Sequence, residues 1–115
     1  MKPFEKIAVR FAEALVAGRW SDAHGLLSVP LQRKLSATAL KTQFFGMFEG
    51  YTDEPALSVH FDPQFSMEEW PAKKAKDVGW AYVGIHGEEF VEAVTVVVCE
   101  GVAGLAIRSI EWGRP

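Results

Sequence analysis

His60 and Asp62 are two residues apart and offer the first candidate chemistry in the chain. In an extended strand, residues i and i+2 project from the same face. An imidazole beside a carboxylate can act as a general base with its orienting group. The pattern also has a simpler interpretation, because Ser58, His60 and Asp62 alternate with apolar residues. They would then form the polar side of a half-exposed strand, and we favour this interpretation over catalysis.

Trp80, Tyr82 and His86 share a face of a later expected strand, and Gly84 leaves a gap between them. Aromatic walls with a phenol and an imidazole suit a small-molecule pocket. They suit a protein interface equally well, because Trp and Tyr are enriched there. We therefore expect packing or a subunit contact at these residues, with a pocket as the alternative.

Two charged residues, Arg108 and Glu111, stand among apolar neighbours in the last expected strand. Simple alternation places them on opposite faces, each partly buried, and a buried charge needs a partner. A carboxylate in an apolar cavity can serve as an acid or a base. Trp112, at the end of this strand, and Phe45, which points away from the other apolar residues of its helix, are further pocket or interface candidates.

Motifs for metals, cofactors and nucleic acids are missing from the sequence. His24 and Cys99 have no neighbouring ligand at CxxC or HExxH spacing, and no GxSxG or glycine-rich phosphate loop occurs. We expect no metal and no cofactor. The densest basic stretch, Lys73, Lys74 and Lys76, is better interpreted as a solvated loop than as a phosphate patch. The net charge of −3 argues against nucleic acid as the partner.

The elements that must position these residues form one domain, 1–115, of ordinary size and apolar content. Apolar spacing predicts helices over 3–17, 20–27 and 37–48, with one further turn at 31–35, and strands over 57–61, 65–70, 78–86, 90–99 and 105–112. Helices followed by hairpin-linked strands indicate an α+β fold.

The last strands are apolar on both faces. Val91, Ala93, Thr95 and Val97 occupy one face of their strand, and Glu92, Val94, Val96 and Val98 occupy the other. In the final strand, alternation sets Leu105 and Ile107 opposite Ile110 and Trp112. Since an antiparallel sheet commonly leaves one face wet, we expect one face to cover the helices and the other to line a pocket or meet another subunit.

Four segments carry a resemblance to a known superfamily: FAEALVAGRWSDAHGLL at 11–27, LSATAL at 35–40, VTVVV at 94–98 and LAIRSIEW at 105–112. In element order and spacing the chain resembles the nuclear transport factor 2-like superfamily, with its SnoaL-like and ketosteroid-isomerase-like members. It is most similar to small bacterial members of unassigned activity. The resemblance implies a cystatin-like cone, in which three N-terminal helices pack in a strongly curved antiparallel sheet. It also implies an apolar cavity at the open end and homodimers through the outer sheet face.

The resemblance implies no particular reaction, because this fold hosts enzymes and plain binders. Its isomerases use an Asp base, a Tyr and a protonated Asp; Tyr82 could match the Tyr, but no Asp occurs in the last three expected strands. We therefore expect a non-catalytic binding or protein-interaction module that binds an apolar small molecule or a protein. One alternative is a small SnoaL- or isomerase-type enzyme acting on an apolar carbonyl compound, which needs at least two of the candidate polar groups to converge. Another is a bacterial immunity or adaptor protein.

The expected compartment is the cytoplasm. Cys99 is the only cysteine, which suits a reducing compartment. Glu5, Lys6 and Arg10 interrupt any apolar run of the kind that a secretory signal needs. No stretch approaches the roughly 20 apolar residues of a membrane span, so we expect a soluble protein.

Overall fold

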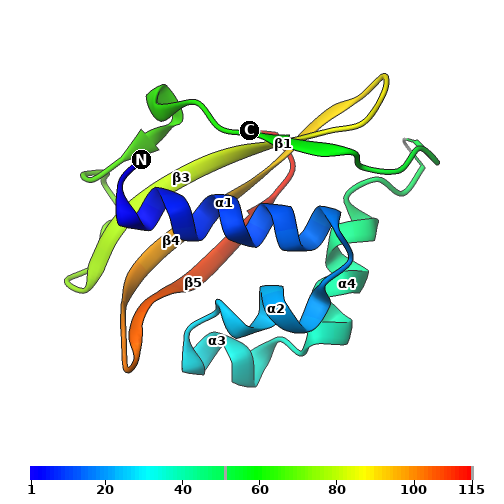
Figure 1. Cartoon of the computed structure of the whole chain (residues 1–115). Coiled ribbons are helices and arrows are strands. Elements are labelled where there is room, and N and C mark those ends of the chain that lie inside the picture. Colours follow the sequence, from blue (N-terminus) through cyan, green and yellow to red (C-terminus); the bar gives the residue numbers. More distant parts are fainter. Residues whose placement is uncertain (51, 115) are drawn as a thin grey trace.

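A computed structural model describes residues 1–50 and 52–114, and within them four helices precede a five-stranded antiparallel sheet (Figure 1). The helices are α1 (Pro3–Val16), α2 (Trp20–Gly25), α3 (Val29–Lys34) and α4 (Ala37–Gly46); the strands are β1 (Ser58–His60), β2 (Ser66–Met67), β3 (Asp77–His86), β4 (Val91–Gly101) and β5 (Gly104–Trp112), with a 3-10 turn, η1 (Pro63–Phe65), before β2. The predicted α+β class is confirmed. None of the described helices has the length and apolar character needed to cross a membrane.

The count of three helices was one too low, because the expected turn at 31–35 is a six-residue helix, α3. Ser28 caps this helix by accepting a hydrogen bond from the backbone N–H of Leu31. Pro30 stands in the first turn, where its missing N–H costs nothing because that donor has no partner inside a helix. Ser28 and Pro30 therefore begin a complete helix where the sequence pattern predicted a single turn.

Helix α1 lies across the sheet and buries one side against it (Figure 1). Phe4, Ala8, Phe11 and Leu15 recur at helical spacing and are all buried. Glu5 is buried as well, and its carboxylate accepts hydrogen bonds from the Lys2 backbone N–H at 2.7 Å and the Ser66 hydroxyl at 2.5 Å. Burial raises the pKa of Glu5, but these bonds and the Lys2 charge outweigh it, so the pKa lies below its usual value.

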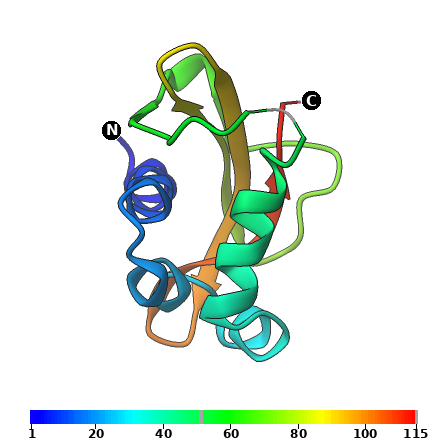
Figure 2. The ribbon, with the colours of Figure 1, turned by 90° about the vertical axis from the view of Figure 1, so that its right-hand side faces the viewer.

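Strand β4 is an interior strand of the sheet, paired with β3 and β5; the strand order is β1-β3-β4-β5, with β2 also paired to β3. Residues 93–99 of β4 are buried without interruption, so both of its faces are covered. Figure 2 shows α1 on one side of the sheet and the segment 68–76, between β2 and β3, arching over the other side. We call the side away from α1 the outer face.

Two register shifts interrupt the pairing at one end of the sheet. Opposite β4, one extra residue is inserted in β3 between Asp77 and Gly79, and another in β5 between Ile107 and Ser109. Such bulges change which face the following side chains occupy. The second bulge overturns the alternation expected for β5, because Ile107 and Ile110 pair with Val98 and Val96 on the same inner face. Leu105 and Trp112 also pack against the inner core, so all four apolar residues share one face.

Gly79 offers a test of how closely α1 approaches the sheet. A Cβ atom at this position would lie 2.1 Å from the Phe4 ring, which is itself buried. We expect Gly79→Ala to lower the free energy of unfolding by about 1–3 kcal/mol, as overpacked cores do. Urea unfolding followed by tryptophan fluorescence measures it.

Gly46→Ala is the matched control, because a Cβ there meets nothing within 4 Å. This substitution in a helix should leave stability unchanged or raise it by up to about 1 kcal/mol. Equal effects of the two substitutions would contradict the close packing of Phe4 on β3.

Candidate functional site

The space between α4 and the sheet is filled by aromatic rings. Phe44 lies at the centre of this cluster, with ring centroids 5.6 Å from Trp20, 5.2 Å from Phe48 and 6.2 Å from Trp112. Trp112 also donates a hydrogen bond from its indole N–H to the Gln43 side-chain oxygen at 2.8 Å. Edge-on ring contacts of this kind stabilise a core beyond their buried area. The predicted pocket candidate Trp112 thus packs against the core but stays partly exposed, and it also lines an open hollow with Met47, Tyr82 and Glu92.

Phe45, the other candidate on this side, stands at the rim of the same cluster. Its ring is 5.6 Å from Trp20 and 5.4 Å from Phe44, yet 52% of the residue is exposed. An open groove of about 920 Å³ runs past it between α4 and residues 49–50 and 52–56. Phe45 therefore joins the core to a surface groove, as its position off the main helix face suggested.

His60 and Asp62 do not form a pair. Strand β1 ends at His60, and Asp62 instead accepts a hydrogen bond from the Gln64 backbone N–H at 2.9 Å, which caps η1. The His60 ring lies 5.6 Å from that of His86. Because strand β1 stops before Asp62, the i, i+2 rule no longer applies, and the expected common face is not formed.

The outer face carries a continuous patch at the β1 end of the sheet. We call it the outer patch; its residues are His60, Phe65, Met67, Trp80, Tyr82, His86 and Val91. Met67 pairs directly with Trp80, and Val91 with His86, so these side chains share a face. The Phe65 and Tyr82 rings lie 5.6 Å apart. Phe65, Met67 and Val91 are 51%, 40% and 44% exposed, which makes the patch an apolar surface.

Arg108 has a buried partner that the sequence did not indicate, Asp77. The guanidinium donates to both Asp77 carboxylate oxygens, from Nε at 2.5 Å and from Nη2 at 2.6 Å, and the Lys74 backbone N–H adds a third bond at 2.8 Å. The Asp77 side chain is fully buried, and that of Arg108 is 24% exposed. The bonds from Arg108 hold the pKa of Asp77 below its usual value despite burial. They also raise the pKa of Arg108.

The expectation that Arg108 and Glu111 occupy opposite faces is wrong. Glu111 pairs with Thr95 and Ser109 with Val97, so both are on the outer face. Arg108 is the extra residue of the β5 bulge and reaches Asp77, whose own partner Cys99 is also on that face. The bulge therefore turns Arg108 outward, onto the face that also carries the exposed Glu111.

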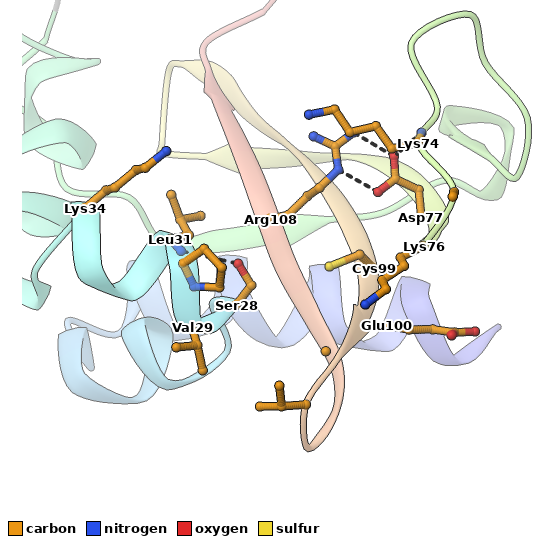
Figure 3. A pocket seen from close by; sticks show the side chains of 14 residues that line it. Ser28, Val29, Leu31, Lys34, Lys74, Lys76, Asp77, Cys99, Glu100 and Arg108 are labelled. Atoms are coloured by element: carbon orange, nitrogen blue, oxygen red, sulfur yellow. Dashed lines mark hydrogen bonds and ion pairs between the residues drawn. The ribbon is translucent and has the colours of Figure 1, made fainter.

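An open pocket of about 730 Å³ adjoins the Asp77–Arg108 pair (Figure 3). We call it the α3–β4 pocket; its lining comes from residues 28–31, Lys34, 74–77, 99–102 and Arg108. The thiol of Cys99 is part of this lining, and burial, with the Asp77 charge, raises its pKa. Sequence reasoning missed this site because its segments are far apart in the chain. The basic stretch at 73–76, directly before a strand, was the one local signal.

Comparison with known proteins adds no relative. No protein-family model, no curated protein and no solved structure matches the chain. In the part of the chain that the structure describes, no three His, Cys, Asp or Glu side chains gather in a way that could hold a metal ion. Function is therefore inferred from the geometry of the described residues.

The Asp77–Arg108 pair can be tested by a double-mutant cycle. Asp77→Asn should cost about 3 kcal/mol of unfolding free energy, near the lower end for a broken buried pair because Arg108 keeps some exposure. Arg108→Met should cost at least as much, since it leaves a buried carboxylate unpaired. The double variant should lose less than the sum of the two by about 1 kcal/mol or more. Urea unfolding at neutral pH measures all three.

Arg114→Met serves as the control, because Arg114 stands 3.9 Å from Glu92 and is mostly exposed. Its effect should stay within about 0.5 kcal/mol. Strictly additive losses for Asp77 and Arg108 would contradict a coupled pair.

The same pair predicts an acid-sensitive fold. Because the folded-state pKa of Asp77 lies below its unfolded value, its stabilisation is complete above about pH 4. It is lost as the pH falls through the folded-state pKa, and Glu5 adds a loss of the same sign. We expect the unfolding free energy of the native chain to fall more steeply below about pH 4 than that of Asp77→Asn. Parallel curves from urea titrations over this range would contradict the prediction.

Proposed function

We propose that this chain is a protein-interaction module whose outer patch binds a second copy of itself. The observation that carries the proposal is the composition of the patch: apolar and aromatic side chains with two histidines, and no Lys, Arg, Asp or Glu. Trp, Tyr, Phe and Met are the residues enriched in interfaces, whereas charged residues are depleted at their cores. Exposed apolar surface of this kind commonly marks an interaction site.

A second copy is the occupant that the charge pattern favours. In a two-fold symmetric interface, the same patch meets itself, so every fixed charge in it would approach its own equivalent. The outer patch has no such charge when its histidines are neutral, and Glu111 on the same face is separated from Tyr82 by Thr95. Tyr82, Trp80 and the histidines supply hydrogen-bonding groups, and Phe65 and Met67 supply exposed apolar area. These properties support a self-complementary contact.

The enzyme alternative receives less support from the geometry. His60 and Tyr82 are on the outer face, Arg108 is bound to Asp77, and Asp62 caps η1. These groups do not converge on one cavity, as a carbonyl-directed acid–base site would need. An immunity or adaptor protein would be a special case of an interaction module, with a different chain in place of the second copy.

The nuclear transport factor 2-like assignment, the cystatin-like cone and an apolar pocket at its open end stay predictions from the resemblance. The groove beside Phe45 is where such a pocket would open, next to Phe44 and Phe48. Dimerisation through the outer sheet face is also what that resemblance implies. The proposed dimer is therefore consistent with the resemblance, but it rests on the composition of the outer patch.

Sedimentation equilibrium at micromolar concentration tests the proposed contact. We expect a dimer for the native chain, and a dissociation constant raised about tenfold or more by Phe65→Asp, since truncating or charging an interface anchor costs that much. Val102→Asp is the matched control: Val102 is 91% exposed but outside the outer patch, so the dimer should persist. A native chain that sediments only as a monomer would refute the proposal.

A further inference from the structure

The α3–β4 pocket gathers positive charge in an acidic protein. Four of the chain's twelve Lys and Arg residues line it, against two of the fifteen Asp and Glu: Lys34, Lys74, Lys76 and Arg108 against Asp77 and Glu100. The chain as a whole carries a net charge of −3. Because the fully buried Asp77 is neutralised by Arg108, the three lysines face only one other carboxylate. The pocket is therefore of the opposite sign to the protein that surrounds it.

Arg108 keeps donor capacity on the pocket side. Asp77 takes the N–H groups of Nε and Nη2, and no described residue takes those of Nη1. In Figure 3 the free nitrogen of the guanidinium points away from Asp77, toward the side on which the Lys34 side chain extends. Asp77 thus holds the guanidinium in one orientation, which lowers the cost of ordering it when a ligand binds.

One wall of the pocket is apolar. It is formed by Val29, Pro30 and Leu31 at the start of α3 and by Val102 at the β4–β5 turn. Figure 3 shows Val29 and Leu31 on the side of the pocket away from Asp77 and Lys74. The volume of about 730 Å³ is in the range of small-molecule sites. A ligand that fits both walls must combine a charged end with an apolar body.

We propose that the α3–β4 pocket binds a small organic anion, with its acidic headgroup between Lys34, Lys74 and the free Nη1 of Arg108 and its apolar body against Val29, Leu31 and Val102. The shared chemistry is an acidic headgroup on an apolar body, which either a carboxylate or a phosphate monoester supplies. The site is independent of the proposed dimer, because it lies at the Cys99 end of β4 and the outer patch at the Val91 end.

Isothermal titration calorimetry with four probes separates the two halves of the site: octyl phosphate, octanoate, inorganic phosphate and 1-octanol. Octyl phosphate or octanoate, whichever headgroup the site prefers, should bind about tenfold or more tighter than inorganic phosphate and 1-octanol, because each of these lacks one half. Added NaCl should weaken binding of the anions, because salt screens the exposed lysines. Amide NMR shifts should cluster on the lining of the pocket.

The double substitution Lys34→Met and Lys74→Met removes two charges but keeps the apolar stems. It should weaken anion binding about tenfold. Lys6→Met is the control, because Lys6 is exposed on α1 and outside the pocket, and should change nothing. Circular dichroism of each variant shows that it is folded.

Three results would overturn the proposal: no binding of either amphiphile at millimolar concentration, equal affinity for 1-octanol and the anions, or equal affinity for inorganic phosphate and octyl phosphate. Amide shifts confined to residues outside the pocket would do the same. A monomeric native chain that still binds octyl phosphate here would refute the dimer alone, so the two proposals fail separately.

Discussion

Strand β4 must be covered on both faces, and the rest of the structure follows from this constraint. Seven consecutive residues, 93–99, are buried, although α1 covers only one face. The inner face is covered by α1 and the aromatic cluster beneath α4. The outer face is covered by the flanking side chains of β3 and β5 and by the segment 68–76 (Figure 2). At the β1 end, the outer face therefore carries large side chains such as those of Trp80 and Tyr82, which flank the small side chains of Ala93 and Thr95.

The two bulges divide that outer face into two regions of different chemistry. Both register shifts occur near the Cys99 end of β4, and together they bring Asp77 and Arg108 onto one face. A fully buried carboxylate would be costly without such a partner. Around this pair the surface is concave and basic, whereas the opposite end of the same strands carries the uncharged outer patch. One face of one sheet can thus support a protein contact and a separate small-molecule site.

The elements that could be predicted are those whose signal is local. The buried side of α1 is visible in the spacing of Phe4, Ala8, Phe11 and Leu15, and the hairpin β4–β5 in its glycines, because both patterns depend on neighbours within a few residues. The sequence predicted only one turn in place of helix α3, because a Ser-x-Pro sequence can end one helix or begin the next. The two possibilities differ in the path that the chain takes after Pro30, which no local pattern indicates.

By itself, the sequence determined the α+β class, the order of the elements and the shared face of Trp80, Tyr82 and His86, since alternation holds along an uninterrupted strand. Tertiary structure alone decided where alternation fails. The bulge at Arg108 moves this charged side chain to the other face, and no local sequence pattern predicts an extra residue in a strand pairing. The α3–β4 pocket also depends on tertiary structure, because strand pairing brings Asp77, Cys99 and Arg108 together and the packing of α3 against β5 adds Lys34.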